Sequence, residues 1–258
     1  MTSVVSEKEG PLGWLTLNRP RVRNALSLEM MEKMREHLDN LAEDPDVRVV
    51  VIRGNGPAFC AGHDMTELTG ADYDIHHFRR VFSTCTELMQ AIHCLPQPVI
   101  AQVHGVATAA GCQLAATCDL VIAESGARFA TPGVKIGLFC STPLVPLCRA
   151  IGRKRALDML LTGRYVSAQE AEQWGLVNRV VEKDTLAGET ERWARELAQS
   201  SRFTVALGKR FFYRQVDQAE EAAYAHALET MSLNCLAQDA QEGMRAAMEK
   251  RKPRWKDR

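Results

Sequence analysis

The sequence lacks several features that would assign it to a specialised class of protein. Its eight cysteines contain no C-x-x-C pair, so a disulfide framework is not indicated. No apolar run reaches the length that a membrane crossing needs. The 32 basic and 32 acidic residues cancel, and nucleic acids or anionic membranes as partners would need a basic excess. We therefore expect a globular protein of a reducing compartment, with neither nucleic acid nor membrane as a partner.

The amino terminus also lacks the features of a targeting segment. Residues 1–5 form neither an apolar signal core nor an Arg-rich transit peptide. A cytoplasmic location is the expectation, with the mitochondrial matrix as the alternative for a processed eukaryotic chain. At 258 residues the chain is long for one domain and short for two. We expect a core over residues 1–200 and a helical region over 201–258.

Apolar strand patterns alternate with amphipathic helix patterns in the first 200 residues. Residues 49–52 and 99–103 are uninterrupted apolar runs, which are typical of strands covered on both faces. Helical spacing follows Ser27, a capping residue, and recurs from Phe78 to Ile92. After about Ser200 the strand signals disappear. The pattern predicts an α/β fold with parallel strands covered by helices.

Two segments that follow buried strands share a design of small residues. They run from Ala58 to Met65 and from His104 to Leu114. Small residues let a ligand approach the main chain, and a helix beginning near Ala110 would direct unpaired N–H groups and a positive dipole end at it. Two N–H groups converging on one oxygen form an oxyanion hole, in which each donor is worth roughly 10²–10³ in rate. Either segment alone is equally consistent with a tight strand-to-helix connection.

Together these segments resemble the crotonase superfamily, also called the enoyl-CoA hydratase/isomerase family. The resemblance extends over nearly the whole chain. Its motifs include Leu17-Asn18-Arg19-Pro20, Phe59-Cys60-Ala61-Gly62 with Asp64, Gly111-Cys112, Cys118-Asp119, Gly175-Leu176-Val177 and Glu242-Gly243-Met244. It implies a crotonase (ClpP/crotonase-like) spiral of ββα units and a C-terminal helical trimerisation region. The implied assembly is a homotrimer or a hexamer, built as a dimer of trimers.

The resemblance also implies a ligand and the residues that bind it. The ligand is an acyl-CoA thioester, and no separate cofactor is implied because coenzyme A is part of the substrate. The N–H groups of His63 and Ala110 match the oxyanion donors, and Arg23 matches a contact to CoA phosphate. Lys252 and Trp255 match a lysine and an aromatic at the adenine end of a neighbouring subunit's CoA. A solvated tail charge and a packed anchor are the alternatives for these two. The implied CoA-binding positions are Arg23, Ala25, Ala61, His63, Asp64, Met65, Ala110, Lys252 and Trp255.

The chain departs from the family where hydratases carry their two glutamates. Gln113 and Gly133 stand at these positions, and neither an amide nor a glycine exchanges a proton near neutral pH. Each general acid or base contributes about 10²–10⁴-fold, so we expect most hydratase activity to be lost. The loop that follows offers Cys140 and Ser141 but no carboxylate. The side chain of His63 is a candidate hydrogen-bonding group or base.

Three functional hypotheses follow. The first is an acyl-CoA enzyme that uses the oxyanion hole without the glutamate pair, for example in decarboxylation of a malonyl-type thioester or in thioester hydrolysis. The second is a non-catalytic acyl-CoA-binding protein. The third is a residual hydratase or isomerase. The sequence contains no fingerprint for a metal, a flavin or a nucleotide cofactor.

Overall fold

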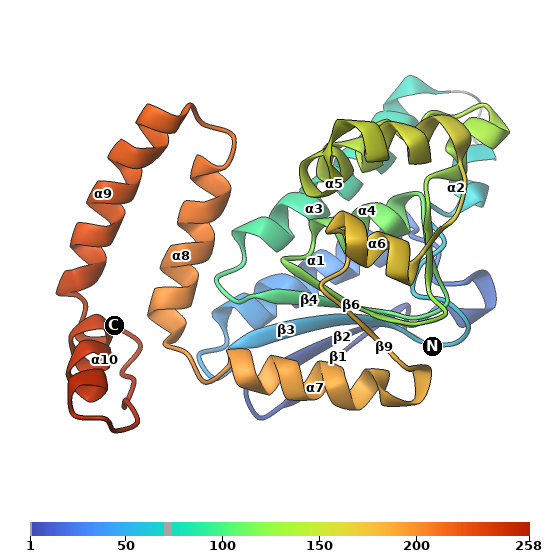
Figure 1. Cartoon of the computed structure of the whole chain (residues 1–258). Coiled ribbons are helices and arrows are strands. Elements are labelled where there is room, and N and C mark those ends of the chain that lie inside the picture. The colour runs from blue at the N-terminus through green and yellow to red at the C-terminus, as the bar shows by residue number, and fades with distance from the viewer. Residues whose placement is uncertain (1, 70–73) are drawn as a thin grey trace.

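The computed structural model describes residues 2–69 and 74–258, which form a large sheet, a small sheet and their covering helices (Figure 1). The described strands are β1 (Val4–Glu9), β2 (Leu12–Leu17), β3 (Val49–Gly54), β4 (Val99–Val103), β5 (Val106–Thr108), β6 (Leu120–Glu124), β7 (Arg128–Ala130), β8 (Val166–Ser167) and β9 (Arg179–Val181). The described α-helices are α1 (Leu28–Glu43), α2 (Met65–Thr69), α3 (Ile75–Cys94), α4 (Ala110–Thr117), α5 (Ser141–Thr162), α6 (Ala168–Trp174), α7 (Leu186–Leu197), α8 (Arg202–Gln215), α9 (Glu220–Leu236) and α10 (Gln238–Met248). The short 3-10 helices are η1 (Pro20–Val22), η2 (Pro132–Ile136) and η3 (Lys183–Thr185).

The larger sheet has the strand order β1-β2-β3-β4-β6-β9. The β1–β2 pair is antiparallel, whereas β2, β3, β4, β6 and β9 pair in parallel. The smaller sheet, β5-β7-β8, begins just beyond β4, so the chain passes from one sheet to the other at residues 104–105. The predicted α/β fold with parallel strands is confirmed.

Both faces of the larger sheet are buried. On one face Val50 and Ile52 belong to the main core beneath α1 and α3, and on the other Val49 and Val51 lie against Trp193 of α7. Figure 1 shows α7 on one side of the sheet and α1, α3, α4 and α5 on the other. Successive side chains of a strand point to opposite faces. Two buried faces therefore require the uninterrupted apolar runs that the sequence shows.

Helix ends follow local sequence signals. Ser27 Oγ accepts a hydrogen bond from the N–H of Met30 (3.3 Å), and Ser167 Oγ accepts one from the N–H of Glu170 (3.1 Å). Gly175 ends α6 with φ 89°, a left-handed conformation that a glycine adopts without a steric penalty. These caps are as the sequence predicts. Within the described part of the chain, no helix has both the length and the apolar character that crossing a bilayer requires.

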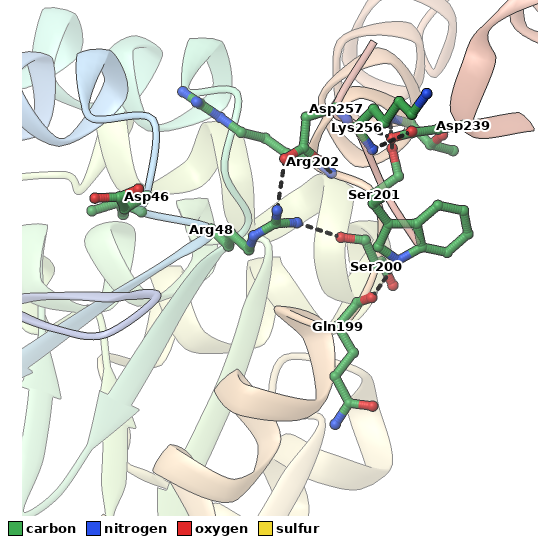
Figure 2. A network of polar contacts seen from close by, with 12 residues as sticks. Asp46, Arg48, Gln199, Ser200, Ser201, Arg202, Asp239, Lys256 and Asp257 are labelled. Carbon is green, nitrogen blue, oxygen red and sulfur yellow. Dashed lines mark hydrogen bonds and ion pairs between the residues drawn. The ribbon is translucent and has the colours of Figure 1, made fainter. Parts of the chain in front are cut away.

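Helices α8, α9 and α10 stand beside the core and carry the carboxyl terminus (Figure 1). The last residues return to the core through a group of polar contacts that we call the tail clasp (Arg48, Ser201, Asp239, Lys256 and Asp257; Figure 2). The buried Asp239 carboxylate accepts hydrogen bonds from Ser201 Oγ (2.5 Å) and from the N–H groups of Lys256 (2.7 Å) and Asp257 (2.9 Å). Asp257 in turn pairs with Arg48 (2.6 Å). The clasp joins the C-terminal tail to the beginnings of α8 and β3.

Candidate active site

The segment from Cys60 to Asp64 lies between the loop before α1 and strand β5. The N–H of Leu26 donates to Gly62 O (2.7 Å), and the N–H of Asp64 donates to Leu26 O (2.9 Å). Because successive N–H groups of an extended chain alternate in direction, the N–H of His63 points away from Leu26. The N–H of His63 therefore points toward β5, on the side where Thr108 Oγ1 donates a hydrogen bond to Ala61 O (3.0 Å).

Helix α4 begins directly after a strained residue. Ala109 has φ 50° and ψ −120°, a conformation that costs a residue with a Cβ about 1–3 kcal/mol. Its N–H donates to Ala130 O (2.9 Å), which holds it beside β7. The sharp turn starts the helix at Ala110, whose N–H has no partner within the helix. Among the described residues, neither this N–H nor that of His63 donates a hydrogen bond.

The two segments touch where these N–H groups lie. A Cβ on Gly62 would lie 2.9 Å from Ala109 Cβ and 3.4 Å from Ala110 N. A Cβ on Gly111 would lie 2.1 Å from Cys60 O, so α4 packs directly on the main chain of the first segment. The N–H groups of His63 and Ala110 are therefore neighbours, and we call them, with the side chains beside them, the paired-amide site. The two small-residue segments meet as the sequence predicts, whereas their role in binding an oxyanion stays a prediction.

Three polar side chains beside these amides lack partners. The imidazole of His63 packs edge-on against Phe82 (5.2 Å between centroids), and both of its ring nitrogens are buried; the main chain of Leu26 is within reach of the ring but makes no hydrogen bond of regular geometry with it. Burial lowers the pKa of His63 to about 4, so the ring is neutral at pH 7. Gln113 Oε1 and Thr131 Oγ1 are likewise buried without a described partner. Such groups are rare in native proteins and require an explanation.

The space beside Gly133 is already filled by the following loop. A Cβ at this position would lie 2.5 Å from Leu138 O and 2.8 Å from Cys140 Sγ, so no larger side chain fits without moving the loop. Burial raises the pKa of the Cys140 thiol and opposes formation of a nucleophilic thiolate. The exposed Ser141 hydroxyl donates to Phe139 O (3.3 Å). A chemical role for Cys140 or Ser141 stays a prediction.

Asp64 has both carboxylate oxygens engaged. One pairs with Arg19 (2.7 Å), and the other accepts from Thr66 Oγ1 (2.7 Å) at the start of α2. Burial raises the pKa of Asp64, but the hydrogen bonds from Thr66 and Arg19 outweigh this effect and hold the pKa below its usual value. Arg19 also donates to Ala25 O (2.6 Å). These contacts hold Asp64 in place within the fold, and its implied contact with CoA stays a prediction. The exposed side chain of Met65 follows it at the start of α2.

The buried side chain of Asn24 holds the loop that carries Arg23. Its amide donates to Ala58 O (2.8 Å) and Phe59 O (3.1 Å), and its oxygen accepts from the N–H of Arg19 (2.8 Å). Arg23 has φ 52° and an exposed side chain, and its carbonyl accepts from the N–H of Ala61 (3.0 Å). The loop therefore presents Arg23 beside the first segment. Its contact with CoA phosphate, and the CoA contacts of Ala25, Ala61 and Met65, stay predictions.

Lys252 and Trp255 lie in the C-terminal region. Lys252 lines a hollow of about 900 Å³ that also contains Arg245 and Arg251. The indole N–H of Trp255 donates to Gln199 O (2.7 Å), and a Cβ on Gly243 would lie 3.2 Å from its ring. These contacts match the packed anchor that was the alternative for Trp255. Contact of either side chain with the adenine of a neighbouring CoA stays a prediction.

The sequence analysis missed three residues that shape this site. Asn24 and Thr131 received no role, and Ala109 was one of several small residues. The positive φ of Ala109 and Asn24 has no signal in side-chain chemistry, because neither residue is a glycine. The buried amide of Asn24 could have been suspected, since asparagine tolerates the left-handed conformation and binds nearby main-chain groups.

The fold and motifs now define the class of protein. The enoyl-CoA hydratase/isomerase family model matches residues 7–258, and the chain belongs to this family. Its fold is the crotonase fold, as predicted. The chain superposes on a crystal structure of an enoyl-CoA hydratase from Mycobacterium smegmatis with a TM-score of 0.96 and 47% identity, covering 99% of each chain.

Among curated relatives, the chain is similar to the proteins named enoyl-CoA hydratase domain-containing protein 3, mitochondrial. It is 50% identical to the Danio rerio protein over 252 residues, which are 97% of this chain and 86% of that protein. It is 47% identical to the Homo sapiens protein over 244 residues, 93% of this chain and 79% of that protein. The human protein's crystal structure superposes with a TM-score of 0.95 and 44% identity, covering 98% of this chain and 100% of that chain.

Proposed function

We propose that this protein binds acyl-CoA thioesters and stabilises the negative charge that develops on the thioester oxygen when an enolate forms. One observation carries the proposal: the N–H groups of His63 and Ala110 lie on touching segments and have no described acceptor. Donors that are positioned before the reaction stabilise developing charge without reorganising during it. The exposed Arg23 on the adjoining loop supplies a cation for the CoA phosphates.

The proposed function excludes efficient hydration of a double bond. The positions of the two hydratase glutamates hold Gln113 and Gly133, and the loop at Leu138 and Cys140 occupies the place of a side chain at residue 133. Without a titratable group at either position, water gains no general base. We expect hydration of crotonyl-CoA at a small fraction of the rate of a hydratase that has both carboxylates.

Two reaction types remain compatible with a site that lacks both glutamates. Decarboxylation of a malonyl-type thioester needs no base, because the carboxylate departs as CO2, the electron pair of the broken C–C bond forms the enolate, and a proton from water completes the acyl product. Hydrolysis would need a water activated by His63, Cys140 or Ser141. The second candidate is a non-catalytic acyl-CoA-binding protein. The site also favours this candidate, because its two N–H groups have no described acceptor while Gln113 and Gly133 cannot exchange a proton. The proposed compartment is the mitochondrial matrix for a processed eukaryotic chain and the cytoplasm otherwise; the names of the zebrafish and human relatives include the word mitochondrial.

Binding calorimetry of the oligomer with butyryl-CoA and with free CoA tests the proposal. We expect butyryl-CoA to bind more tightly, because only the thioester offers a carbonyl to the two amides. In Gly62→Ala, the added Cβ separates the two segments and should weaken butyryl-CoA at least about 10-fold more than CoA, as loss of one to two hydrogen bonds predicts. Equal affinity of the wild type for both ligands, or no binding of either, would contradict the proposal.

Turnover separates the catalytic from the non-catalytic form of the proposal. Crotonyl-, malonyl- and 3-hydroxybutyryl-CoA are each incubated with the wild type, and the products are separated by chromatography. Conversion of one of them identifies an enzyme. Binding without conversion of any supports the non-catalytic candidate. Rapid hydration of crotonyl-CoA would contradict the role assigned to the missing carboxylates.

We further propose that the chain assembles as a homotrimer or a dimer of trimers through its C-terminal helices. Helix α9 exposes Tyr224 (70%), Leu228 (66%) and Leu236 (78%), and an apolar helix face of this extent indicates a protein interface. Sedimentation analysis should give three or six copies. Leu228→Glu should shift the protein to smaller species, whereas the same assembly in both proteins would contradict an interface at α9.

A further inference from the structure

A hollow of about 630 Å³ opens between the end of α3 and helix α8. Leu95 and Pro96 line this hollow and precede β4 in the chain, whereas Ala110 of the paired-amide site follows the end of β4. The hollow therefore lies at the opposite end of β4 from the paired-amide site. Its volume is in the range of sites that bind small molecules.

One wall of the hollow is held in place by buried polar contacts around Asp119. The carboxylate of Asp119 accepts hydrogen bonds from Lys209 Nζ (2.6 Å), from the Tyr213 hydroxyl (2.7 Å) and from the N–H of residue 99 (2.7 Å). The ring of His93 stacks on that of Tyr213 with 3.9 Å between centroids, and both residues line the hollow. This aromatic wall is fixed before any ligand binds, because its polar groups already have partners.

Two arginines of α8 line the hollow without a counter-ion. Arg210 and Arg214 are four residues apart, so they lie on one face of the helix, and both are exposed. Neither forms an ion pair with a described residue. Asp119 is occupied by the contacts given above, and Asp217, close to the end of α8, pairs with Arg149 (3.2 Å). Like charges at this spacing repel each other, so an anion bound between them would stabilise the helix.

The chemistry of the hollow restricts the ligand that it can bind. No acidic side chain is among the described residues that line it. His93 is partly buried and its Nε2 lies 3.0 Å from Thr117 O. Burial lowers the pKa of His93, so the ring adds no charge at pH 7. The two guanidinium groups can bind the oxygens of a carboxylate or a phosphate, and the aromatic wall offers apolar surface beside them.

We propose that the hollow between α3 and α8 binds a small organic anion, whose carboxylate or phosphate group is held by Arg210 and Arg214 and whose apolar part packs against Tyr213. This ligand site is separate from the paired-amide site and does not depend on the proposed function. A bound anion adds contacts between α8 and the end of α3, and so fastens the first C-terminal helix to the core.

Binding of four probes to the full-length oligomer, measured by calorimetry, tests the two parts of the ligand separately. Phenyl phosphate and benzoate carry both a ring and an anionic group, inorganic phosphate carries the charge alone, and benzyl alcohol carries the ring alone. We expect phenyl phosphate or benzoate to bind at least about 10-fold more tightly than either partial probe, the factor that a charge-assisted hydrogen bond supplies. The tighter of the two distinguishes a phosphate ligand from a carboxylate ligand. If neither binds better than the partial probes, the inference is wrong.

Charge removal assigns the binding to the two arginines. The double variant Arg210→Gln, Arg214→Gln should weaken the tighter aromatic anion at least about 10-fold. The matched control is Arg153→Gln, which removes one exposed arginine of α5 that does not line the hollow, and it should change the affinity by less than about 2-fold. An equal loss in the control would overturn the assignment. Dissociation of the oligomer in the double variant, detected by sedimentation, would show that the hollow is a contact between copies and would also overturn it.

The exposed thiol of Cys94 reports on occupancy of the hollow, because Cys94 lines it. The tighter aromatic anion should slow alkylation of Cys94 by iodoacetamide, measured by mass spectrometry, and should leave alkylation of the half-buried Cys235 in α9 unchanged. Saturating butyryl-CoA should not alter the affinity for the anion. Equal protection of both cysteines, or displacement of the anion by butyryl-CoA, would place the anion at another site and overturn the inference.

Discussion

The tail clasp and the paired-amide site both bury polar groups, but only the first satisfies them. In the clasp, Asp239 is 1% exposed and accepts three hydrogen bonds (Figure 2). At the paired-amide site, Gln113 is 4% exposed and its Oε1 lacks a partner among the described residues. A satisfied buried network stabilises the fold, whereas an unsatisfied one lowers stability unless a ligand completes it. The comparison separates a buried polar network that the fold completes from one that the fold leaves incomplete.

The two regions also differ in backbone strain. Ala109, at the paired-amide site, holds a positive φ of 50° directly before a helix of the core. In the clasp, Asp257 also has a positive φ (57°), but it lies one residue from the chain end and its carboxylate is paired with Arg48. Strain inside the core persists because β7 and the first small-residue segment hold Ala109 from both sides. Such strain is concentrated at functional sites.

The largest expected effect comes from breaking the clasp. Asp239→Ala leaves the N–H groups of Lys256 and Asp257 without their acceptor, and we expect the free energy of unfolding to fall by about 3 kcal/mol or more. Urea unfolding at one fixed protein concentration measures it. Asp217→Ala is the control, because its pair with Arg149 is exposed and should change stability by less than about 1 kcal/mol. Equal effects of the two substitutions would contradict a structural role of the clasp.

The second effect is a pH dependence that arises at the paired-amide site. The pKa of His63 is lowered from 6.5 to about 4 in the folded state, so the unfolded chain binds more protons between these values. Stability is unaffected by this group above pH 6.5 and falls as pH decreases toward 4, by up to about 3 kcal/mol. Unfolding curves at pH 7, 5.5 and 4 for the wild type and His63→Leu measure the difference. If both proteins lose the same stability, His63 is not buried in its neutral form.

A smaller loss of stability comes from filling the space beside Gly133. Gly133→Ala places a Cβ 2.5 Å from Leu138 O, and we expect a loss of about 2 kcal/mol from overpacking. Gly188→Ala is the matched control, because nothing lies within 4 Å of its Cβ position in α7, and it should gain about 0.5–1 kcal/mol. Thermal and urea unfolding provide the two measurements. If Gly133→Ala left the free energy of unfolding unchanged, the loop at Leu138 would have to move easily, and the position would be open to a larger side chain.

The smallest expected effect is a gain in stability from a substitution at Ala109. Ala109→Gly removes the Cβ penalty of the positive φ and should raise the free energy of unfolding by about 1 kcal/mol. Ala115→Gly, in the interior of α4, should lower it by about the same amount, since helical glycine is unfavourable relative to alanine. A higher free energy of unfolding for Ala109→Gly and a lower one for Ala115→Gly, both from urea unfolding, would confirm that the strain is local to Ala109. A loss in both variants would indicate that Ala109 packs favourably despite its conformation.

Much of the fold could be predicted because its signals are local. Val49–Ile52 and Val99–Val103 are apolar on both faces, Ser27 and Ser167 are caps, and strand patterns end before Ser200. The described elements from Arg202 onward are helices. Each of these signals depends on side chains within a few residues of one another.

The sequence by itself determined the α/β architecture, the helix caps, the two small-residue segments and the absence of carboxylates at Gln113 and Gly133. Tertiary structure alone decided that Gly62 meets Ala109, that Leu138 fills the space beside Gly133, and that the nitrogens of His63 are left without described partners. These facts depend on residues that are distant in sequence. Local chemistry specifies which hydrogen bonds a residue can make, and only the packed chain determines which of them remain for a ligand.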